Sequence, residues 1–451
     1  MEEKRDWLKW LRMTKEKRIS VAIMLVLAPL CFVCAFIFIN MGWTEQYLII
    51  PQVFLGILGL LPYLITLIRY FYEEIPIKIF PVISMLILTG ITIANVMLIA
   101  VALFGGYRRP PVIQTDLPPT TSNLEHSRIE ISMNAPIHIR IFDIDCDGED
   151  KDERCRLLDE AFELIFELER RFTVNDVGGE VERINEMAGI EPVVVEESTF
   201  YLIEQAIYYS IYSQRLFNAA IGPLTRMWNI SMDGARRPSD DEIDGVLPLL
   251  DPELVVLDAA ASTVFLEYVG MRLDLGAIAK GYMADLVAEL LTSNGVDRAL
   301  LIVGGEVLAV GGRYDGTPFR IGIRTPFPEE DGGDLVGTIP AYNQAVVTSG
   351  IYNRYLADQD SRTIYHHIFD SRTGFPFDTD IVSMTVVADT GLLGEVYSTI
   401  VFALGIEEGM AYVEAHPSIE AMFISRDNGV YLSSGLVDSF ELLLVDEFEV
   451  R

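Results

Sequence analysis

Hydrophobic residues are distributed very unevenly along this chain of 451 residues. Three long apolar runs occupy the N-terminal quarter, at residues 19–43, 47–68 and 77–104. Each run supplies the roughly 20 apolar residues that a helix needs to cross the hydrocarbon core of a bilayer. The pattern therefore predicts three transmembrane helices within residues 19–104, preceded by a short basic segment, residues 1–18, and places the lipid bilayer among the partners.

The positive charges around these runs predict their orientation. Seven Lys and Arg residues precede the first run, the first connecting loop has none, and the second loop carries Arg69 and Lys78. Loops rich in Lys and Arg stay in the cytoplasm. We therefore expect a multi-pass protein of the cell membrane with a cytoplasmic N-terminus, and an extracytoplasmic location for everything after the third run.

After the runs the pattern changes to a linker and a large mixed domain. Residues 105–128 are rich in Pro, Thr and Ser and predict an extended linker, and residues 129–451 form the domain. Apolar positions at helical spacing predict helices at 152–172, 198–216, 279–293, 392–403 and 406–415, the second opened by a Ser198–Thr199 cap. Strands are expected at 139–144, 254–258, 263–268, 298–303, 306–312, 319–324, 345–350, 382–388, 421–426 and 429–433. Because helices and strands do not alternate strictly, the pattern predicts an α+β fold.

Composition agrees with this division. The mean hydropathy is +0.30, although the formal net charge is −32, so the apolar and acidic residues must lie in different parts of the chain. Binding to nucleic acid requires clusters of Lys and Arg. The acidic balance of the domain therefore argues against a nucleic-acid partner.

The acidic segment after the first expected strand allows two interpretations. Asp143, Asp145, Asp147 and Gly148 match the opening of a calcium loop, but Arg154 stands where such a loop has its last glutamate. A solvated acidic loop is the alternative. Cys146 lies within this segment and Cys155 at its end, and an extracytoplasmic domain would allow them to oxidise.

The segment "LDLGAIAKGYMAD", residues 273–285, carries the first chemistry. Gly276, Ala277 and Ala279 are small enough for a ligand to approach the backbone, and the helix that follows has free N–H groups at its positive end. Lys280 adds a charge suited to an anion, and Asp274 can accept hydrogen bonds. The segment is consistent with a phosphate-bearing ligand, or with a tight strand-to-helix turn that carries a surface lysine.

Three further segments favour the first interpretation. Thr348 and Ser349 place hydroxyls at a strand end, where they could hold phosphate or ribose. Glu395 and Thr399 are spaced i, i+4, so that their oxygens project from one helical face, a hard-oxygen set suited to Mg²⁺. The segment "YHHIFDSRTGFP" brings histidines, an aspartate and an arginine together, although His367 taken alone could be a structural histidine.

Taken together, these motifs resemble the FAD:protein FMN transferases, or ApbE-type flavin transferases. The resemblance runs from about residue 129 to 444 and is carried in order by "MNAPIHI", "FTVNDVGGEVERIN", "LFNAAIGPLTRMW", "LDLGAIAKGYMAD", "LLIVGGEVLAVGG", "VVTSGIYNRY", "YHHIFDSRTGFP" and "EVYSTIVFALG". Members of the family cleave the pyrophosphate of FAD, transfer FMN to a Ser or Thr hydroxyl of an acceptor protein through a phosphoester bond, and release AMP. Together with the three apolar runs and their expected orientation, the resemblance implies a membrane-anchored transferase that acts on an extracytoplasmic acceptor flavoprotein.

The resemblance also implies roles for individual residues. FAD-contacting positions correspond to Asn175, Leu216, Phe217, Asn218, Asp274 and Lys280. The Mg²⁺ ligands correspond to the carbonyl of Ala277 and the side chains of Glu395 and Thr399, and His367 lies next to the nucleotide. Glu395 and His367 are the expected catalytic residues, with Glu395 taking the proton of the acceptor hydroxyl.

The chain departs from the family's pattern at several positions. Asn218 and Glu395 each replace an aspartate, "MNA" at 133–135 replaces "MGT", and "DSRTG" replaces "DPRTG" at 370–374. These changes leave two alternatives to the transferase. One is a non-catalytic FAD-binding or redox domain, and the other is a membrane scaffold that has lost the nucleotide.

Overall fold

The computed structural model describes residues 124–451, except 134, 147–151, 175–177, 327–333, 353 and 358–362. The three expected transmembrane runs and their orientation lie outside the described residues. Strand β1 (Glu125–Ser132) begins inside the segment that the sequence assigned to the linker. Its residues pair with β2 (Ala135–Phe142) along their whole length, so these residues belong to the sheet.

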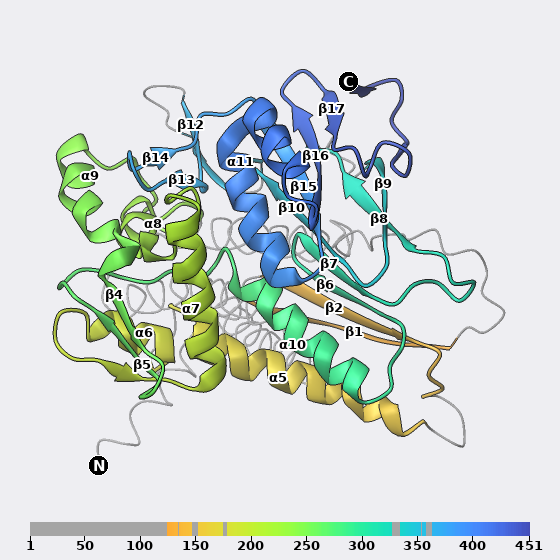
Figure 1. Cartoon of the computed structure of the whole chain (residues 1–451), viewed down its shortest axis with the longest axis horizontal. Helices are drawn as coiled ribbons and strands as arrows, with labels where there is room; N and C mark the ends of the chain where they lie inside the picture. The colour runs from red at the N-terminus through yellow and green to blue at the C-terminus, as the bar shows by residue number, and fades with distance from the viewer. Residues whose placement is uncertain are drawn as a thin grey trace, which may run out of the picture. The chain divides into compact units, whose positions relative to one another are not determined.

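A nine-stranded sheet is the centre of the described residues (Figure 1). Its strands follow in the order β1, β2, β6 (Ala299–Val303), β7 (Glu306–Val310), β10 (Ala345–Gly350), β15 (Ile381–Ala388), β16 (Ile419–Ser425), β17 (Gly429–Leu432) and β19 (Glu449–Val450). Neighbouring strands are antiparallel except for the last pair. This antiparallel sheet with helices on one face agrees with the expected α+β class.

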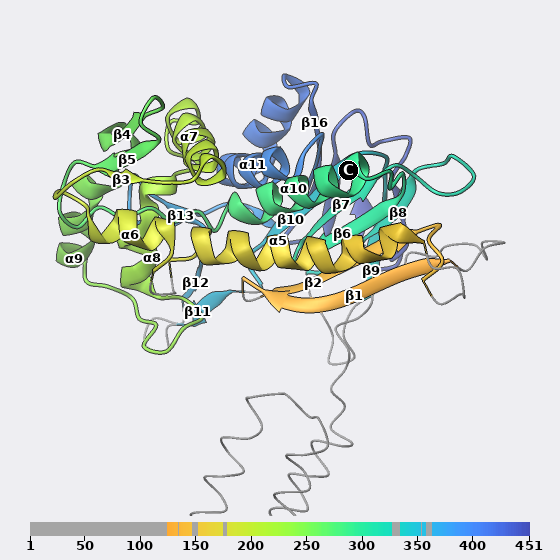
Figure 2. The same ribbon diagram turned by 90° about the horizontal axis from the view of Figure 1, so that it is seen from below.

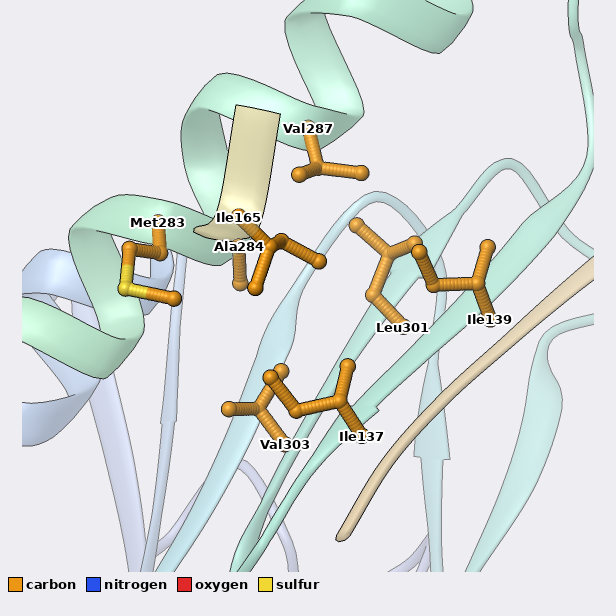
Figure 3. Close-up of a pocket in the computed structure, with 8 residues that line it drawn as sticks. All are labelled: Ile137, Ile139, Ile165, Met283, Ala284, Val287, Leu301 and Val303. Carbon is orange, nitrogen blue, oxygen red and sulfur yellow. The ribbon is translucent and has the colours of Figure 1, made fainter. Parts of the chain in front are cut away.

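Three helices cover one face of the sheet. Helices α5 (Leu157–Phe172), α10 (Ala279–Ser293) and α11 (Gly391–Glu414) lie side by side over it (Figure 2). Their apolar residues join those of the strands in one large core. A small apolar cavity of about 10 Å³ remains where Met283, Ala284 and Val287 of α10 face the strands (Figure 3). Only apolar side chains line it, so it is a packing gap and not a polar ligand site.

The opposite face of the sheet is covered by a second, smaller sheet. Its strands are β8 (Phe319–Arg324), β9 (Leu335–Ala341) and β18 (Glu441–Leu442). A second core lies between the two sheets. Because both faces of the central strands are buried, all eight residues of β15 are buried, which agrees with its mostly apolar sequence.

The remaining elements stand beside the large sheet (Figure 1). They comprise the helices α6 (Glu180–Glu186), α7 (Glu197–Tyr212), α8 (Gly222–Trp228) and α9 (Asp240–Val246), the strands β3 (Val193–Val194), β4 (Val255–Asp258) and β5 (Thr263–Leu266), and the short pairs β11 (Tyr355–Ala357) with β12 (Ile364–His366) and β13 (Phe369–Asp370) with β14 (Phe375–Pro376). Trp228 is fully buried here and donates its indole N–H to the carbonyl of Gly374. This bond joins α8 to the "DSRTGFP" segment.

Several expected elements need correction at their ends. Helix α7 begins with Glu196 as its cap residue, and no side chain caps it. The expected Ser–Thr cap is wrong because Thr199 lies within the first turn and is buried. The two helices expected at 392–403 and 406–415 are both present within α11, which is kinked between them at Gly405, where φ is +80° and the backbone is non-helical. Of the described helices, α11 alone is long and apolar enough to cross a membrane, and half of that stretch is buried against the protein.

The acidic segment between β2 and α5 contains a disulfide between Cys146 and Cys155. Asp143 forms an ion pair with Arg298, and Asp152 forms one with Arg154 at 2.6 Å. Asp147 lies outside the described residues. Asp143 and Asp152 therefore face arginines, which favours the acidic-loop interpretation.

Candidate active site

The strand-like segment before α10 is fixed by two neighbouring segments. The side chain of Asn185 donates to the carbonyl of Leu273 and accepts from its N–H, at 3.1 and 2.6 Å. The N–H of Asp274 donates to the carbonyl of Ala219 at 2.8 Å. These bonds place the 216–220 and 272–276 segments, both expected to contact FAD, beside each other.

Asp274 and the start of α10 form hydrogen bonds within the protein, whereas the sequence suggested groups that were free to bind a ligand. Asp274 accepts the N–H of Gly276 at 2.9 Å and the hydroxyl of Thr225 at 2.8 Å. The N–H groups of Ile278 and Ala279 donate to the carbonyl of Leu275 at 3.0 and 2.8 Å. The expected row of free donors is therefore shorter, although the positive end of the α10 dipole remains directed at the site.

Lys280 is ion-paired and mostly buried, and it is not a surface lysine. Its ammonium lies 2.8 Å from a carboxylate oxygen of Glu395 and donates to the carbonyl of Gly276 at 3.0 Å. Burial by itself would lower the pKa of Lys280, but the Glu395 carboxylate outweighs burial and raises this pKa above its usual value. Lys280 therefore carries its charge throughout the neutral range.

Two glycines bring Lys280 and Glu395 together. A Cβ at Gly391 would lie 2.5 Å from the carbonyl oxygen of Gly281, and a Cβ at Gly281 would overlap the carbonyl of Gly391. The first turns of α10 and α11 thus touch backbone to backbone. This close approach places the side chain of Lys280, one residue before Gly281, against the side chain of Glu395, one helical turn after Gly391.

The first turns of α11 connect to the neighbouring strand through hydroxyls. Thr399 donates to the carbonyl of Glu395 at 3.3 Å, as a back-bonded helical threonine does. Ser398 donates to the same carbonyl at 2.8 Å, and Ser349 of β10 donates to Ser398 at 3.0 Å. Thr348 bonds to Thr385 of β15, with 2.9 Å between the hydroxyl oxygens. Ser349 therefore lies in the network of Glu395, whereas Thr348 bonds across the sheet.

Two acidic residues that sequence reasoning missed lie at the same junction. Asp285 accepts the N–H groups of Gly391 and Leu392 at 2.6 and 2.9 Å, and burial raises its pKa to about 6. Glu306 is wholly buried, and neither of its carboxylate oxygens has a hydrogen-bond partner. The available signal for Glu306 was a single charge in the otherwise apolar segment "LLIVGGEVLAV".

Electrostatics link Glu306 to the Lys280–Glu395 pair. Burial, followed by the charges of Glu395 and Asp285, raises the pKa of Glu306 well above its usual value, and Lys280 opposes this effect. The junction therefore contains more carboxylates than ammonium groups. The raised pKa favours the protonated, neutral form of Glu306, and a nearby cation would favour its ionised form.

The donor types at this junction fit Mg²⁺. The described residues contain no group of three or more His, Cys, Asp or Glu side chains that could hold a metal. The expected set does not need one, because it combines the Glu395 carboxylate, the Thr399 hydroxyl and the Ala277 carbonyl, all of them hard oxygen donors. A cation would fit beside the Lys280–Glu395 pair and the unpartnered carboxyl group of Glu306, at the junction of α10 and α11.

His367 is neutral in this structure. Its Nδ1 lies 3.1 Å from the carbonyl oxygen of Arg354, which can only accept, so Nδ1 carries the hydrogen and Nε2 keeps its lone pair. Burial, assisted by the positive charges of Arg354, His366 and Lys280, lowers the pKa of His367 to about 3. His366 is structural, because its Nε2 donates to the carbonyl of Phe377 at 2.9 Å.

The Leu216–Asn218 segment explains one departure from the family's pattern. Phe217 is buried, Leu216 is partly buried, and the Asn218 amide donates to the carbonyl of Leu250 at 2.8 Å and to the hydroxyl of Ser371 at 3.0 Å. An aspartate could donate to neither. Ser371 is itself the departure from "DPRTG", so two of the changed positions are bonded to each other.

A hollow of about 400 Å³ opens beside this contact, lined by residues that include Arg215, Asp251 and Arg372. Ser371 donates to the carbonyl of Arg215 at 3.2 Å, which joins the hollow to Asn218. Asn175, the remaining expected FAD contact, lies outside the described residues.

The fold and the junction define the class of protein first. An α+β domain that holds a lysine and hard oxygen donors where two helices begin is suited to binding a nucleotide pyrophosphate. The sequence profile of the ApbE family matches residues 133–423, and the chain belongs to this family. The family resemblance that the motifs indicated is therefore confirmed.

Similar proteins agree in sequence and in fold. An FAD:protein FMN transferase of Klebsiella pneumoniae is 37% identical over 314 residues, which cover 70% of this chain and 93% of that protein. One of Treponema pallidum is 34% identical over 332 residues, which cover 71% of this chain and 90% of that protein. The solved flavin transferase ApbE of Vibrio cholerae is 25% identical, with a TM-score of 0.59, and covers 70% of this chain and 99% of that chain.

Proposed function

We propose that this chain is a membrane-anchored FAD:protein FMN transferase that acts on an acceptor protein outside the cytoplasm. The observation that carries the proposal is the family match over residues 133–423, with relatives of that activity aligned over nine-tenths of their length. The Lys280–Glu395 pair at the convergence of α10 and α11 supports it, because it supplies charged groups where the family's motifs meet.

The reaction breaks the phosphoanhydride bond of FAD and forms a phosphoester bond. The oxygen of a Ser or Thr hydroxyl of the acceptor attacks the FMN phosphorus, the bond from that phosphorus to the AMP phosphate oxygen breaks, and AMP leaves with the electron pair. The hydroxyl proton passes to a carboxylate, which we assign to Glu395. Catalysis of this kind depends mostly on positioning and charge stabilisation.

The chain's own residues have distinct tasks in this scheme. Lys280 binds the pyrophosphate oxygens, and the neutral imidazole of His367 orients the nucleotide through the lone pair on Nε2. Asp274, Asn218 and the hydroxyl of Ser349 keep the FAD-contacting segments in place. Ala277, Glu395 and Thr399 would hold Mg²⁺, which would supply neutralisation of the pyrophosphate charge.

The location outside the cytoplasm has two independent supports. The basic N-terminus and three apolar runs predict it from the sequence. The disulfide between Cys146 and Cys155 is a feature that persists in oxidising compartments and is rare in the cytosol.

The test is covalent transfer of FMN. The full chain in detergent is incubated with FAD, Mg²⁺ and a protein that accepts FMN from one of the relatives, and intact masses are recorded. We expect the acceptor to gain the mass of FMN less one water, and AMP to appear in equal amount. If the chain binds FAD but the acceptor mass stays unchanged, even with an acceptor that the Vibrio cholerae enzyme labels in parallel, the chain is a non-catalytic flavin-binding protein.

A further inference from the structure

Glu306 is the feature of this junction that the expected ligand set does not explain. It begins strand β7, all five residues of which are buried, and it is 0% exposed. Both of its carboxylate oxygens are buried without a hydrogen-bond partner. Among the described residues, no other carboxylate has this combination of burial and missing partners.

Stability does not account for a glutamate at this position. Burying a carboxylate without partners costs several kcal/mol when it is charged. Glu306 pairs across the sheet with Val303 and Val347, in a setting where an apolar residue would pack without that cost. A costly polar group that a fold retains in its interior is a candidate for function.

The carboxylate of Glu306 reaches the contact between α10 and α11. A Cβ at Gly391 would overlap one of its oxygens, so the carboxylate lies directly against the glycine contact that joins the two helices. The charged groups that act on it are Glu395 on α11 and Asp285 and Lys280 on α10. Asp285 accepts two N–H groups of α11, and Lys280, the one positive charge among these groups, is paired with Glu395.

We propose that Glu306 supplies a second carboxylate charge to the divalent-cation site, beside Glu395. The family's ligand set of Ala277, Glu395 and Thr399 contains a single carboxylate, and Lys280 neutralises that one. The raised pKa of Glu306 favours its neutral form in the free protein, and a divalent cation that enters this buried junction takes the place of the carboxyl proton, which is released to solvent. Glu306 acts as a positioning residue through charge, and the inference rests on the proposed Mg²⁺-dependent function.

Direct cation binding tests this role without relying on turnover. The free Mn²⁺ signal in electron paramagnetic resonance reports how much Mn²⁺ the full chain binds, with and without saturating FAD. Glu306→Gln keeps the shape of the side chain and removes the charge. We expect the affinity for Mn²⁺ to fall about 10- to 100-fold, the range seen when groups that support metal ligands are removed.

Three further proteins make the result decisive. Glu395→Gln should lose Mn²⁺ binding, and Glu160→Gln, which removes an exposed carboxylate paired with Arg156, should bind as the wild type does. Glu306→Asp keeps the charge and should bind Mn²⁺ more tightly than Glu306→Gln. Without cation, Glu306→Gln should unfold at the same temperature as the wild type or at a higher one.

The outcomes separate this inference from the proposed function. If the wild type binds no Mn²⁺ even with FAD, the metal dependence of the proposed function fails, and this inference fails with it. If the wild type and Glu306→Gln bind Mn²⁺ equally while Glu395→Gln does not, the inference alone is wrong. Equal weakening in Glu306→Asp and Glu306→Gln, or a lowered unfolding temperature in Glu306→Gln, would show that the side chain serves packing and not charge.

Discussion

At the scale of single residues, Lys280 carries the most information. It is the only lysine in residues 152–451, where every other strongly basic side chain is an arginine. A lysine is a compact point charge that can move between partners, whereas an arginine presents a fixed planar fork. The proposed role of Lys280, which pairs with Glu395 and would also contact a pyrophosphate, requires this mobility.

Replacing Lys280 should weaken FAD binding. Lys280→Met keeps most of the packing of the stem and removes the charge. A hydrogen bond to a charged group contributes about 1.5–3 kcal/mol, so we expect FAD to bind about 10- to 150-fold more weakly. Titration followed by flavin fluorescence at fixed ionic strength measures this, with Arg156→Met as the control for loss of one exposed positive charge. Equal affinities in all three proteins would limit Lys280 to fixing the turn.

His367 should make the FAD-free protein sensitive to acid. Its pKa is about 3 in the folded chain, against about 6.5 in an unfolded one, so folding favours the neutral ring. The stability linked to this group is complete above pH 6.5 and is lost as the pH falls from 6.5 toward 3, by at most about 1.4 kcal/mol per pH unit. Unfolding temperatures of the wild type and His367→Gln should therefore differ by a constant amount above pH 7. Below pH 6 the unfolding temperature of the wild type should fall relative to that of the variant. Parallel curves down to pH 4 would contradict the buried neutral state.

At the scale of secondary-structure elements, the contact between α10 and α11 builds the site. Helical spacing predicted both elements, and α10 has the expected limits, Ala279–Ser293. The contact between their first turns depends on Gly281 and Gly391, whose role cannot be recognised from either helix alone. Strand β9 was missed because Gly337 and Pro340 interrupt its apolar pattern, and pairing with β8 compensates for them.

An added methyl group at this contact should be costly. In Gly281→Ala the new Cβ would overlap the backbone of Gly391, which cannot move without displacing α11. Overpacking of this kind costs about 1–3 kcal/mol, and urea denaturation should report a loss in that range. Gly245→Ala in α9 is the matched control, because a Cβ there would meet nothing within 4 Å and alanine favours the helix. Similar effects at both positions would show that the two helices are not in close contact.

At the scale of the whole molecule, the proposed membrane anchoring predicts a definite orientation. The positive charges before the first apolar run predict a cytoplasmic N-terminus, and three spans would place the catalytic domain outside. In right-side-out membrane vesicles, added protease should cleave the domain without detergent. Inverted vesicles, which expose the cytoplasmic face, serve as the control and should protect it. Cleavage in the inverted vesicles alone would reverse the orientation and remove the extracytoplasmic acceptor.

The sequence by itself determined the family, the α+β class, and the positions and types of the long elements, because these depend on local periodicity and on motifs that stand in order along the chain. It also pointed to Lys280, Glu395, Thr399 and His367 as candidates, since their residue types and spacing are visible without a fold. It left the partners of these residues open.

Only the tertiary structure decided those partners. The pairing of Lys280 with Glu395 joins residues 115 positions apart (395 − 280), and the bond between Asn218 and Ser371 joins residues 153 positions apart. The Glu306 carboxylate lies against Gly391 of another segment and has no hydrogen-bond partner there. Such contacts depend on how helices pack on a sheet, and a sequence pattern reports only neighbours within a turn or a strand. The burial of Glu306 could not be predicted for the same reason, since burial is a property of the assembled core and not of the segment that carries the residue.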